Sequence, residues 1–198
     1  MDRKPVIVYC TPSLYIPGGI ERVLTTKANY LADVAGYTVY IILTDGQDKS
    51  PYYPLSSQIR LIQLGIEFEE LWDLPLYKKI IVYLQKQRIY KCKLRNVLFS
   101  IKPDITVSLM RREINFITSI KDGSKKVGEL HINKKNYRNF KTETNNFFKK
   151  MLSTFWSTLN PQLHSRSATY IKRNGLLIRK ITIKSSRPFQ CAYHPLTP

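Results

Sequence analysis

The chain has 198 residues, of which 43% are hydrophobic and 12% aromatic, so it is too apolar to be disordered and long enough to bury a core. No run approaches about 18 apolar residues, which excludes a membrane-spanning helix. The mostly apolar run at residues 5–10 is too short for a signal-peptide core, and we therefore expect a cytoplasmic protein. Three widely spaced cysteines, Cys10, Cys92 and Cys191, favour neither a disulfide framework nor a zinc site.

The charge is strongly positive and unevenly distributed. The net charge is +18, from 32 lysines and arginines against 14 acidic residues. The last acidic residue is Glu143, and residues 144–198 hold nine basic residues and no acid. Half of the excess charge therefore lies in the last quarter of the chain, a balance that favours contact with anionic membranes or nucleic acid.

Hydrophobic periodicity predicts an alternation of strands and helices. In chain order we expect strands at residues 5–10, 37–43, 58–64, 104–109 and 126–131, and helices at 20–36, 76–101 and 112–120. The first strand is apolar and largely β-branched, which is typical of a strand buried on both faces of a parallel sheet. This order of elements predicts an α/β fold with a doubly wound, mainly parallel sheet.

The predicted helix at 76–101 carries an apolar stripe and a basic outer face. The stripe consists of Leu76, Ile80, Tyr83, Leu84, Tyr90, Leu94, Leu98 and Ile101, and outside it lie Lys78, Lys86, Arg88, Lys93 and Arg95. Such a face could meet nucleic acid or anionic lipid, although most charge-rich helix faces are simply solvated. Nothing in the sequence matches a nucleic-acid-binding module, so we expect no specific nucleic acid as a partner.

Gly18 and Gly19 join the first strand to the first helix. Two glycines let a ligand approach the backbone closely, and the N-terminus of a helix offers free N–H groups to an anion. Ligands of open parallel sheets bind at the carboxyl ends of the strands, where this join lies. A plain tight turn is the simpler explanation of the dipeptide alone, and the third glycine of a dinucleotide fingerprint is missing.

His131, Arg111 and Arg112 also follow predicted strands. His131 could serve as an acid, a base or a hydrogen-bond donor to a sugar hydroxyl, or be only a surface histidine. The arginine pair could hold a phosphate or an acidic sugar, or be solvated. We find no Cys/His cluster with metal spacing, no P-loop and no nucleophile elbow, and we expect no metal site.

The segments around these residues resemble a known enzyme family. The opening strand, loop and helix with Gly18-Gly19-Ile20-Glu21-Arg22, together with PDITVSLMRREINF and VGELHINKKN, resemble the N-terminal domain of family 4 glycosyltransferases. These are enzymes of the GT-B fold, and the sequence is most similar to the bacterial members that build capsular, exo- or lipopolysaccharide. The resemblance covers residues 4–150 and implies a Rossmann-like domain at 1–150. It also implies retention of the anomeric configuration, with no metal and no other cofactor.

The resemblance also implies roles for single residues. The positions that match donor- or acceptor-binding positions are Gly18, Gly19, Glu21, Arg111 and Arg112. The two glycines match the loop whose backbone approaches the donor diphosphate and the acceptor, and Glu21 would shape that loop. Arg111 and Arg112 would contact the acceptor. His131 matches the strand-end position near the transferred sugar and is the expected catalytic residue.

The second half of such an enzyme, which binds most of the nucleotide-sugar and carries two glutamates eight positions apart, is not recognisable in the sequence. Residues 151–198 contain no acid and no clear helical stripe. We expect either a truncated, frameshifted product with a disordered tail, or a genuine basic tail that binds membrane or nucleic acid.

The resemblance therefore implies a glycosyltransferase of the hexosyltransferase type. It would transfer a sugar from a nucleotide-sugar to a glycan or lipid-linked acceptor in cell-surface polysaccharide synthesis. We expect the chain alone to be inactive and cytoplasmic, with peripheral contact at the inner face of the cell membrane as an option. The alternative is a non-catalytic basic remnant that binds a membrane surface or nucleic acid.

Overall fold

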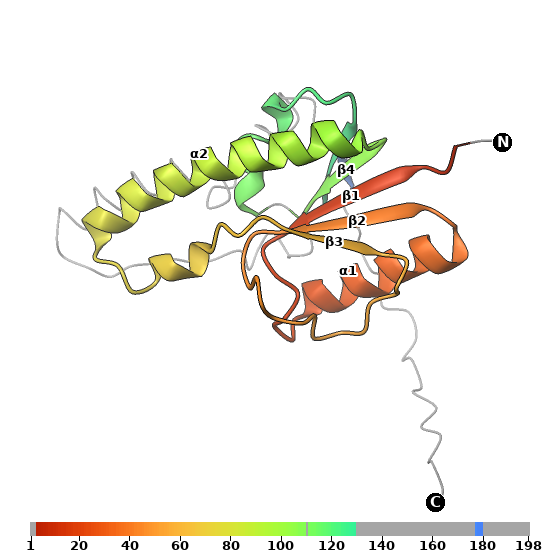
Figure 1. Ribbon diagram of the computed structural model, residues 1–198, viewed down its shortest axis with the longest axis horizontal. Coiled ribbons are helices and arrows are strands. Elements are labelled where there is room, and N and C mark those ends of the chain that lie inside the picture. Colours follow the sequence, from red (N-terminus) through yellow and green to blue (C-terminus); the bar gives the residue numbers. More distant parts are fainter. Residues whose placement is uncertain (1–2, 110, 130–176, 180–198) are drawn as a thin grey trace, which may run out of the picture.

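The computed structural model describes residues 3–109, 111–129 and 177–179, whose strands form one sheet (Figure 1). The strands are β1 (Val6–Thr11), β2 (Thr38–Leu43), β3 (Arg60–Gln63), β4 (Ile105–Ser108), β5 (Lys125–Glu129) and β6 (Leu177–Arg179). They lie in the order β3-β2-β1-β4-β5-β6, and every neighbouring pair is parallel. The order runs outward in both directions from β1 and β4, which is the Rossmann-like, doubly wound arrangement that the sequence predicts.

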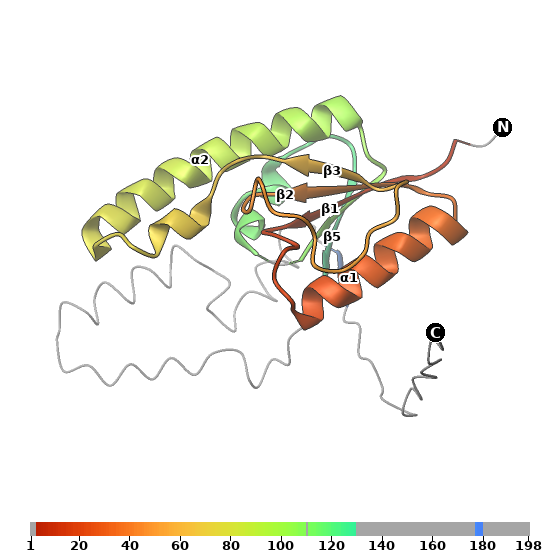
Figure 2. The same cartoon turned by 60° about the horizontal axis from the view of Figure 1, so that its bottom comes forward.

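Two long helices cover opposite faces of this sheet (Figures 1 and 2). They are α1 (Gly19–Asn29), continued by the π-helical turn η1 (Tyr30–Val34), and α2 (Leu76–Ile101); the shorter 3₁₀ turns are η2 (Phe68–Leu71), η3 (Arg112–Asn115) and η4 (Ile117–Ser119). Side chains alternate along a strand, so β1 packs Ile7 and Tyr9 on the α1 side and Val8 and Cys10 on the α2 side. None of these four is more than 5% exposed, which confirms a strand buried on both faces.

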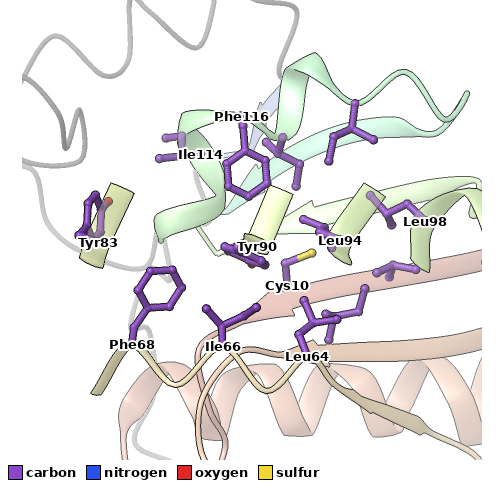
Figure 3. Packing of buried hydrophobic residues seen from close by; sticks show 14 of the residues in the cluster. Cys10, Leu64, Ile66, Phe68, Tyr83, Tyr90, Leu94, Leu98, Ile114 and Phe116 are labelled. Atoms are coloured by element: carbon purple, nitrogen blue, oxygen red, sulfur yellow. The ribbon is translucent and has the colours of Figure 1, made fainter. Parts of the chain in front are cut away.

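The core beneath α2 is rich in aromatic residues. Figure 3 shows the buried side chains that α2 turns toward the sheet and the adjoining loops: Tyr83, Tyr90, Leu94 and Leu98. The ring of Tyr90 lies 6.0 Å from that of Phe68 and 5.1 Å from that of Phe116, both in edge contacts. These contacts tie the helix to the segments that follow β3 and β4. The sequence also places Leu84 on this stripe, but Leu84 is 39% exposed. Leu84 follows the buried Tyr83 directly, and one step along an α-helix turns the side chain by about 100°, away from the core.

Two lysines that the sequence assigns to the outer face of α2 bind backbone carbonyls instead. The Nζ of Lys86 donates to the carbonyl oxygens of Ile66 and Glu67 at 2.6 Å each. The Nζ of Lys93 donates to the carbonyl oxygen of Leu64 at 2.6 Å. Long lysine stems let the charged end reach past the apolar stripe, so both residues join α2 to the segment after β3.

The short helix predicted at 112–120 consists of two 3₁₀ turns, η3 and η4. The buried isoleucines in this segment are Ile114, Ile117 and Ile120, at most 3% exposed. Their spacing of three residues matches the period of a 3₁₀ helix, in which residues i and i+3 share a face. An α-helix would spread these side chains over a wider arc, so tertiary packing selects the tighter turn.

Several predictions fall on residues beyond the described ranges. His131 and most of the segment at 151–198 lie outside them, and the interpretation of that segment as a disordered or frameshifted tail is not tested. Leu177–Arg179 form β6, which pairs with β5 at the edge of the sheet. Within the described ranges, no helix is long and apolar enough to cross a membrane.

The packing of α2 predicts a large difference between two leucines on the same helix. Leu94 is fully buried and Leu84 is 39% exposed. Leu94→Ala should lower the free energy of unfolding by about 2 to 5 kcal/mol, because it leaves a cavity in the core. Leu84→Ala should change it by about 0.5 kcal/mol or less. Urea unfolding followed by circular dichroism measures both values, and equal losses would contradict the packing described here.

Candidate functional site

The candidate site lies at the carboxyl ends of β1 and β4, the two neighbouring strands from which the strand order runs outward in opposite directions. The two strands pair in register, with Cys10 opposite Ser108. The segment that leaves β1 leads to Gly18 and Gly19, and the segment that leaves β4 leads to Arg111. In doubly wound sheets, the crevice between two such segments is the usual ligand site. The topology therefore brings two of the predicted motifs, far apart in sequence, to one edge of the sheet.

Gly19 begins α1 with open space around its backbone. A Cβ built on Gly19 would meet no heavy atom within 4 Å. No side chain caps this helix, and its first backbone bond runs from the N–H of Arg22 to the carbonyl of Gly18 at 3.0 Å. The N–H groups of the first turn therefore have no partner within the helix. A helix N-terminus with uncapped N–H groups and free space beside Gly19 can accept an anionic group at short range.

Gly18 is crowded where Gly19 is open. A Cβ on Gly18 would come within 2.0 Å of the Oε2 of Glu21, because the Glu21 carboxylate folds back over the N-cap position. An acid in this third helical position also interacts favourably with the helix dipole. The geometry agrees with a loop-shaping role for Glu21.

Arg112 is held by internal partners. Its Nη1 donates to the Oδ2 of Asp45 at 3.2 Å, and its guanidinium lies 4.5 Å from the ring centre of Phe68. Asp45, at the end of β2, is 1% exposed and also accepts from the Thr44 hydroxyl at 2.8 Å and from the backbone N–H of Phe68. Burial raises the pKa of Asp45, and the neighbouring Arg112 opposes that shift. Arg112 thus joins the segment after β4 to the end of β2.

Arg111 differs from its neighbour. Within the described ranges, no ion pair or hydrogen bond engages its guanidinium, which is half-buried. Its backbone N–H donates to the Oε1 of Glu113 at 3.1 Å, and the Ser108 hydroxyl donates to the same oxygen at 2.7 Å. The backbone of Arg111 is therefore fixed while its side chain stays available to a ligand.

Glu113 is a buried carboxyl group beneath the site. It is 1% exposed, and burial raises its pKa above the usual range, although the hydrogen bond from Ser108 acts in the opposite direction. A carboxyl group that accepts two hydrogen bonds from one turn fixes the geometry of that turn. Its function is to position the segment after β4.

The loop after β1 is fixed by the loops after β2 and β3. The Tyr15 hydroxyl donates to Glu69, and the Nζ of Lys49 lies 3.9 Å from the centre of the Tyr15 ring. The hydrogen bond to Glu69 raises the pKa of Tyr15. Gly46 has φ of 74°, and a Cβ there would come within 2.6 Å of the Tyr15 ring. Only glycine fits this position without displacing the tyrosine.

A second cluster lies on the α1 side of β5. Lys27 of α1 pairs with Glu129, the last residue of β5, and its Nζ lies 5.3 Å from the centre of the Tyr9 ring. Burial raises the pKa of Tyr9, and the charge of Glu129 adds to the shift. This cluster anchors the strand end two residues before His131.

The two buried carboxylates of the site, Asp45 and Glu113, are not predicted from the sequence. The sequence alone indicates a turn at Asp45, because its partners Phe68 and Arg112 lie on other segments. It indicates only a polar residue of a short helix at Glu113, because nothing in the sequence shows that this side chain turns inward. A local signal exists only for Asp45, which lies two residues after the apolar strand β2. Within the described ranges, no three His, Cys, Asp or Glu side chains gather as metal ligands do.

Comparison with solved structures identifies a similar fold in sucrose-phosphate synthase from Thermosynechococcus elongatus, a glycosyltransferase of the GT-B fold. The TM-score is 0.52 at 11% sequence identity, and the match covers 90% of this chain and 48% of that one. This chain therefore spans about half the length of that structure. The likeness shows the fold: a Rossmann-like domain of the kind found in GT-B glycosyltransferases. No protein-family model and no curated protein matches the sequence.

The buried Glu113 predicts a pH-dependent stability. Because its pKa is raised in the folded state, the stability that protonated Glu113 contributes is present at low pH and is lost as pH rises through the raised pKa. Glutamine does not ionise, so Glu113→Gln removes this loss of stability at higher pH. Its amide oxygen can still accept the hydrogen bonds from Ser108 and Arg111. The variant should therefore gain stability relative to the wild type as pH rises from about 4 to 8.

Urea unfolding at several pH values measures this difference. Glu70→Gln is the matched control, because the Glu70 side chain is 68% exposed and its removal should give no comparable trend. A difference between Glu113→Gln and wild type that stays flat with pH would contradict the raised pKa.

Proposed function

We propose that this domain is the acceptor-side half of a glycosyltransferase. The reaction would transfer a sugar from a nucleotide-sugar to a glycan or lipid-linked acceptor. The observation that carries the proposal is that the strand order brings two features to the carboxyl edge of the sheet: the open backbone of Gly19, and Arg111, whose guanidinium makes no ion pair or hydrogen bond within the described residues. A diphosphate needs close N–H donors, and an anionic acceptor needs an available cation.

The chain's own groups would act mainly by positioning and electrostatics. The free N–H groups at the start of α1 would bind oxygens of the donor diphosphate as its leaving charge grows. Arg111 would hold a phosphate or an acidic sugar of the acceptor, while Arg112 keeps the loop in place through Asp45. His131 would act near the transferred sugar, two residues beyond the anchored Glu129.

The finer features of the proposal rest on the family resemblance. They are membership of family 4, hexosyl transfer with retention, independence of a metal ion, and a place in cell-surface polysaccharide synthesis. The resemblance also implies that a second Rossmann-like domain binds most of the nucleotide-sugar. The 48% coverage of sucrose-phosphate synthase is consistent with a domain that works together with such a partner half.

The arginine pair predicts two distinct phenotypes. Arg112→Gln should lower the free energy of unfolding by about 1 to 3 kcal/mol, because it leaves the buried Asp45 without its cation. Arg111→Gln should leave stability unchanged and raise the KM for the acceptor. Urea unfolding and steady-state kinetics measure the two effects. A stability loss in Arg111→Gln as large as that in Arg112→Gln would contradict the assignment of separate roles.

Gly19 gives the sharpest test of sugar transfer. We expect the 198-residue chain alone to transfer no sugar, and residues 1–150 fused to the second domain of a related enzyme to regain transfer. In that fusion, Gly19→Val should abolish turnover because its branched side chain would fill the space that the diphosphate needs. The fold should tolerate valine, since no heavy atom lies within 4 Å of the new Cβ.

Two further variants complete this experiment. Thr26→Val is the control, because it adds a valine to the exposed side of the same helix and should leave turnover unchanged. His131→Ala should lower kcat more than it raises the KM for the donor. An active fusion in which Gly19→Val and His131→Ala both keep wild-type turnover would show that the site lies elsewhere. A fusion that binds acidic polymers but never transfers sugar would favour the basic binding remnant.

A further inference from the structure

The outward face of α2 carries a stripe that the proposed sugar transfer does not use. Its members follow one another at alternating steps of four and three residues, which places them on one face of the helix: Tyr77, Ile81, Leu84, Arg88, Lys91 and Arg95. All six side chains are exposed. The first three are apolar and the last three are cationic, so the stripe is divided into an apolar half and a basic half.

The apolar half lies at the projecting end of the molecule. Tyr77 is 64% exposed and Ile81 57% exposed, and Trp72, just before the helix, is 72% exposed. Figure 1 shows this end of α2 extending beyond the sheet. Large aromatic and aliphatic side chains gathered at an exposed end are costly in water, so they mark an interaction surface.

The charge of the helix indicates the chemistry of the partner. The 26 residues of α2 include seven basic residues and no acidic one. Lys86 and Lys93 bind internal carbonyls, but the cations of the outward stripe have no carboxylate beside them on the helix. Arg95 lies 5.5 Å from the ring centre of Phe99, which is itself 45% exposed. The partner is therefore anionic and also accepts apolar side chains.

We propose that this face of α2 docks onto an anionic lipid surface, with the apolar half inserted at the headgroup boundary and the basic half on the phosphates. Interfacial helices combine these two components in this way. A second copy of the chain fits less well, because antiparallel stripes would set apolar residues against cations and parallel stripes would set cations against cations. Nucleic acid would use the cations but would leave Ile81 and Leu84 without a role.

The test uses the full 198-residue chain and sedimentation with vesicles. Vesicles of phosphatidylcholine with about 30% phosphatidylglycerol should bind the protein, and vesicles of phosphatidylcholine alone should bind it weakly or not at all. Each cation near an anionic surface contributes roughly fivefold to partitioning. Arg88→Gln with Lys91→Gln should therefore lower partitioning by about 20- to 30-fold.

The apolar half is tested independently of charge. Ile81→Ser with Leu84→Ser should lower partitioning by about tenfold or more, since two apolar side chains no longer insert. Val34→Ser is the apolar control, because Val34 is 69% exposed but lies on η1, the turn that continues α1. Lys4→Gln with Lys125→Gln is the matched charge control, because both lysines are exposed away from α2, Lys4 just before β1 and Lys125 at the start of β5. Both controls should keep most of the binding.

Three outcomes would overturn the proposal. The first is equal loss in the α2 charge variant and the Lys4/Lys125 control, which would mean that net charge alone drives binding. The second is unchanged partitioning in the Ile81/Leu84 variant, together with equally tight binding to a DNA duplex, which would identify a polyanion site. The third is a change of oligomeric state in sedimentation velocity without any vesicle binding, which would identify the face as a contact between copies.

Discussion

The length of α2 relative to the sheet governs the arrangement of the whole domain. At 1.5 Å per residue, its 26 residues extend about 39 Å, whereas the six residues of β1 extend about 20 Å. The C-terminal end of α2 is fixed at the amino edge of the sheet, where Lys102 caps the helix and Asp104 accepts the N–H of Val6 at 2.7 Å. The N-terminal half must therefore project past the carboxyl ends of the strands. Its inner face can be buried only if other segments reach out to cover it.

The segments that cover this projection are the ones that shape the candidate site. Phe68 from η2 and Phe116 after η3 pack against Tyr90, and Lys86 holds the backbone after β3. Once these segments lie against α2, Arg112 is close enough to reach Asp45 across 67 residues of sequence. The ion pair is thus a consequence of aromatic packing under the helix. Because Arg112 pairs with Asp45 inside the domain, Arg111 is the member of the pair that we propose binds a ligand.

The parts of this structure that sequence could predict are those set by local periodicity. The predicted strand at 5–10 and the predicted helix at 76–101 agree closely with β1 and α2. A strand buried on both faces gives an unbroken apolar run, and a long helix gives a sustained apolar stripe, so each has a distinct pattern. The roles of Asp45 and Lys86 could not be predicted, since each depends on partners from another segment. Within the described residues, Glu113 bonds only to its own turn, but its burial depends on the segments packed around that turn. The turns at 112–120 show the same limit: a period of three in isoleucines suits either helix type until the facing surface is known. The two glycines at a strand–helix join, together with the family resemblance, predict a ligand-approach position at Gly19, whereas its open surroundings are a property of the folded chain.

The projecting half of α2 also connects the two proposals made here. Its inner face positions the segment that presents Arg111, and its outer face carries the divided stripe that begins at Tyr77. If the outer face rests on an anionic bilayer, the carboxyl edge of the sheet lies near the lipid surface, because both belong to the same end of the molecule. A lipid-linked acceptor would then reach Arg111 without leaving the membrane, and its phosphate would meet the side chain of a residue whose backbone Glu113 fixes. This geometry predicts a stronger dependence of transfer on anionic lipid for lipid-linked acceptors than for free glycans. If transfer to both kinds of acceptor depended equally on anionic lipid, membrane docking would not serve to deliver the acceptor.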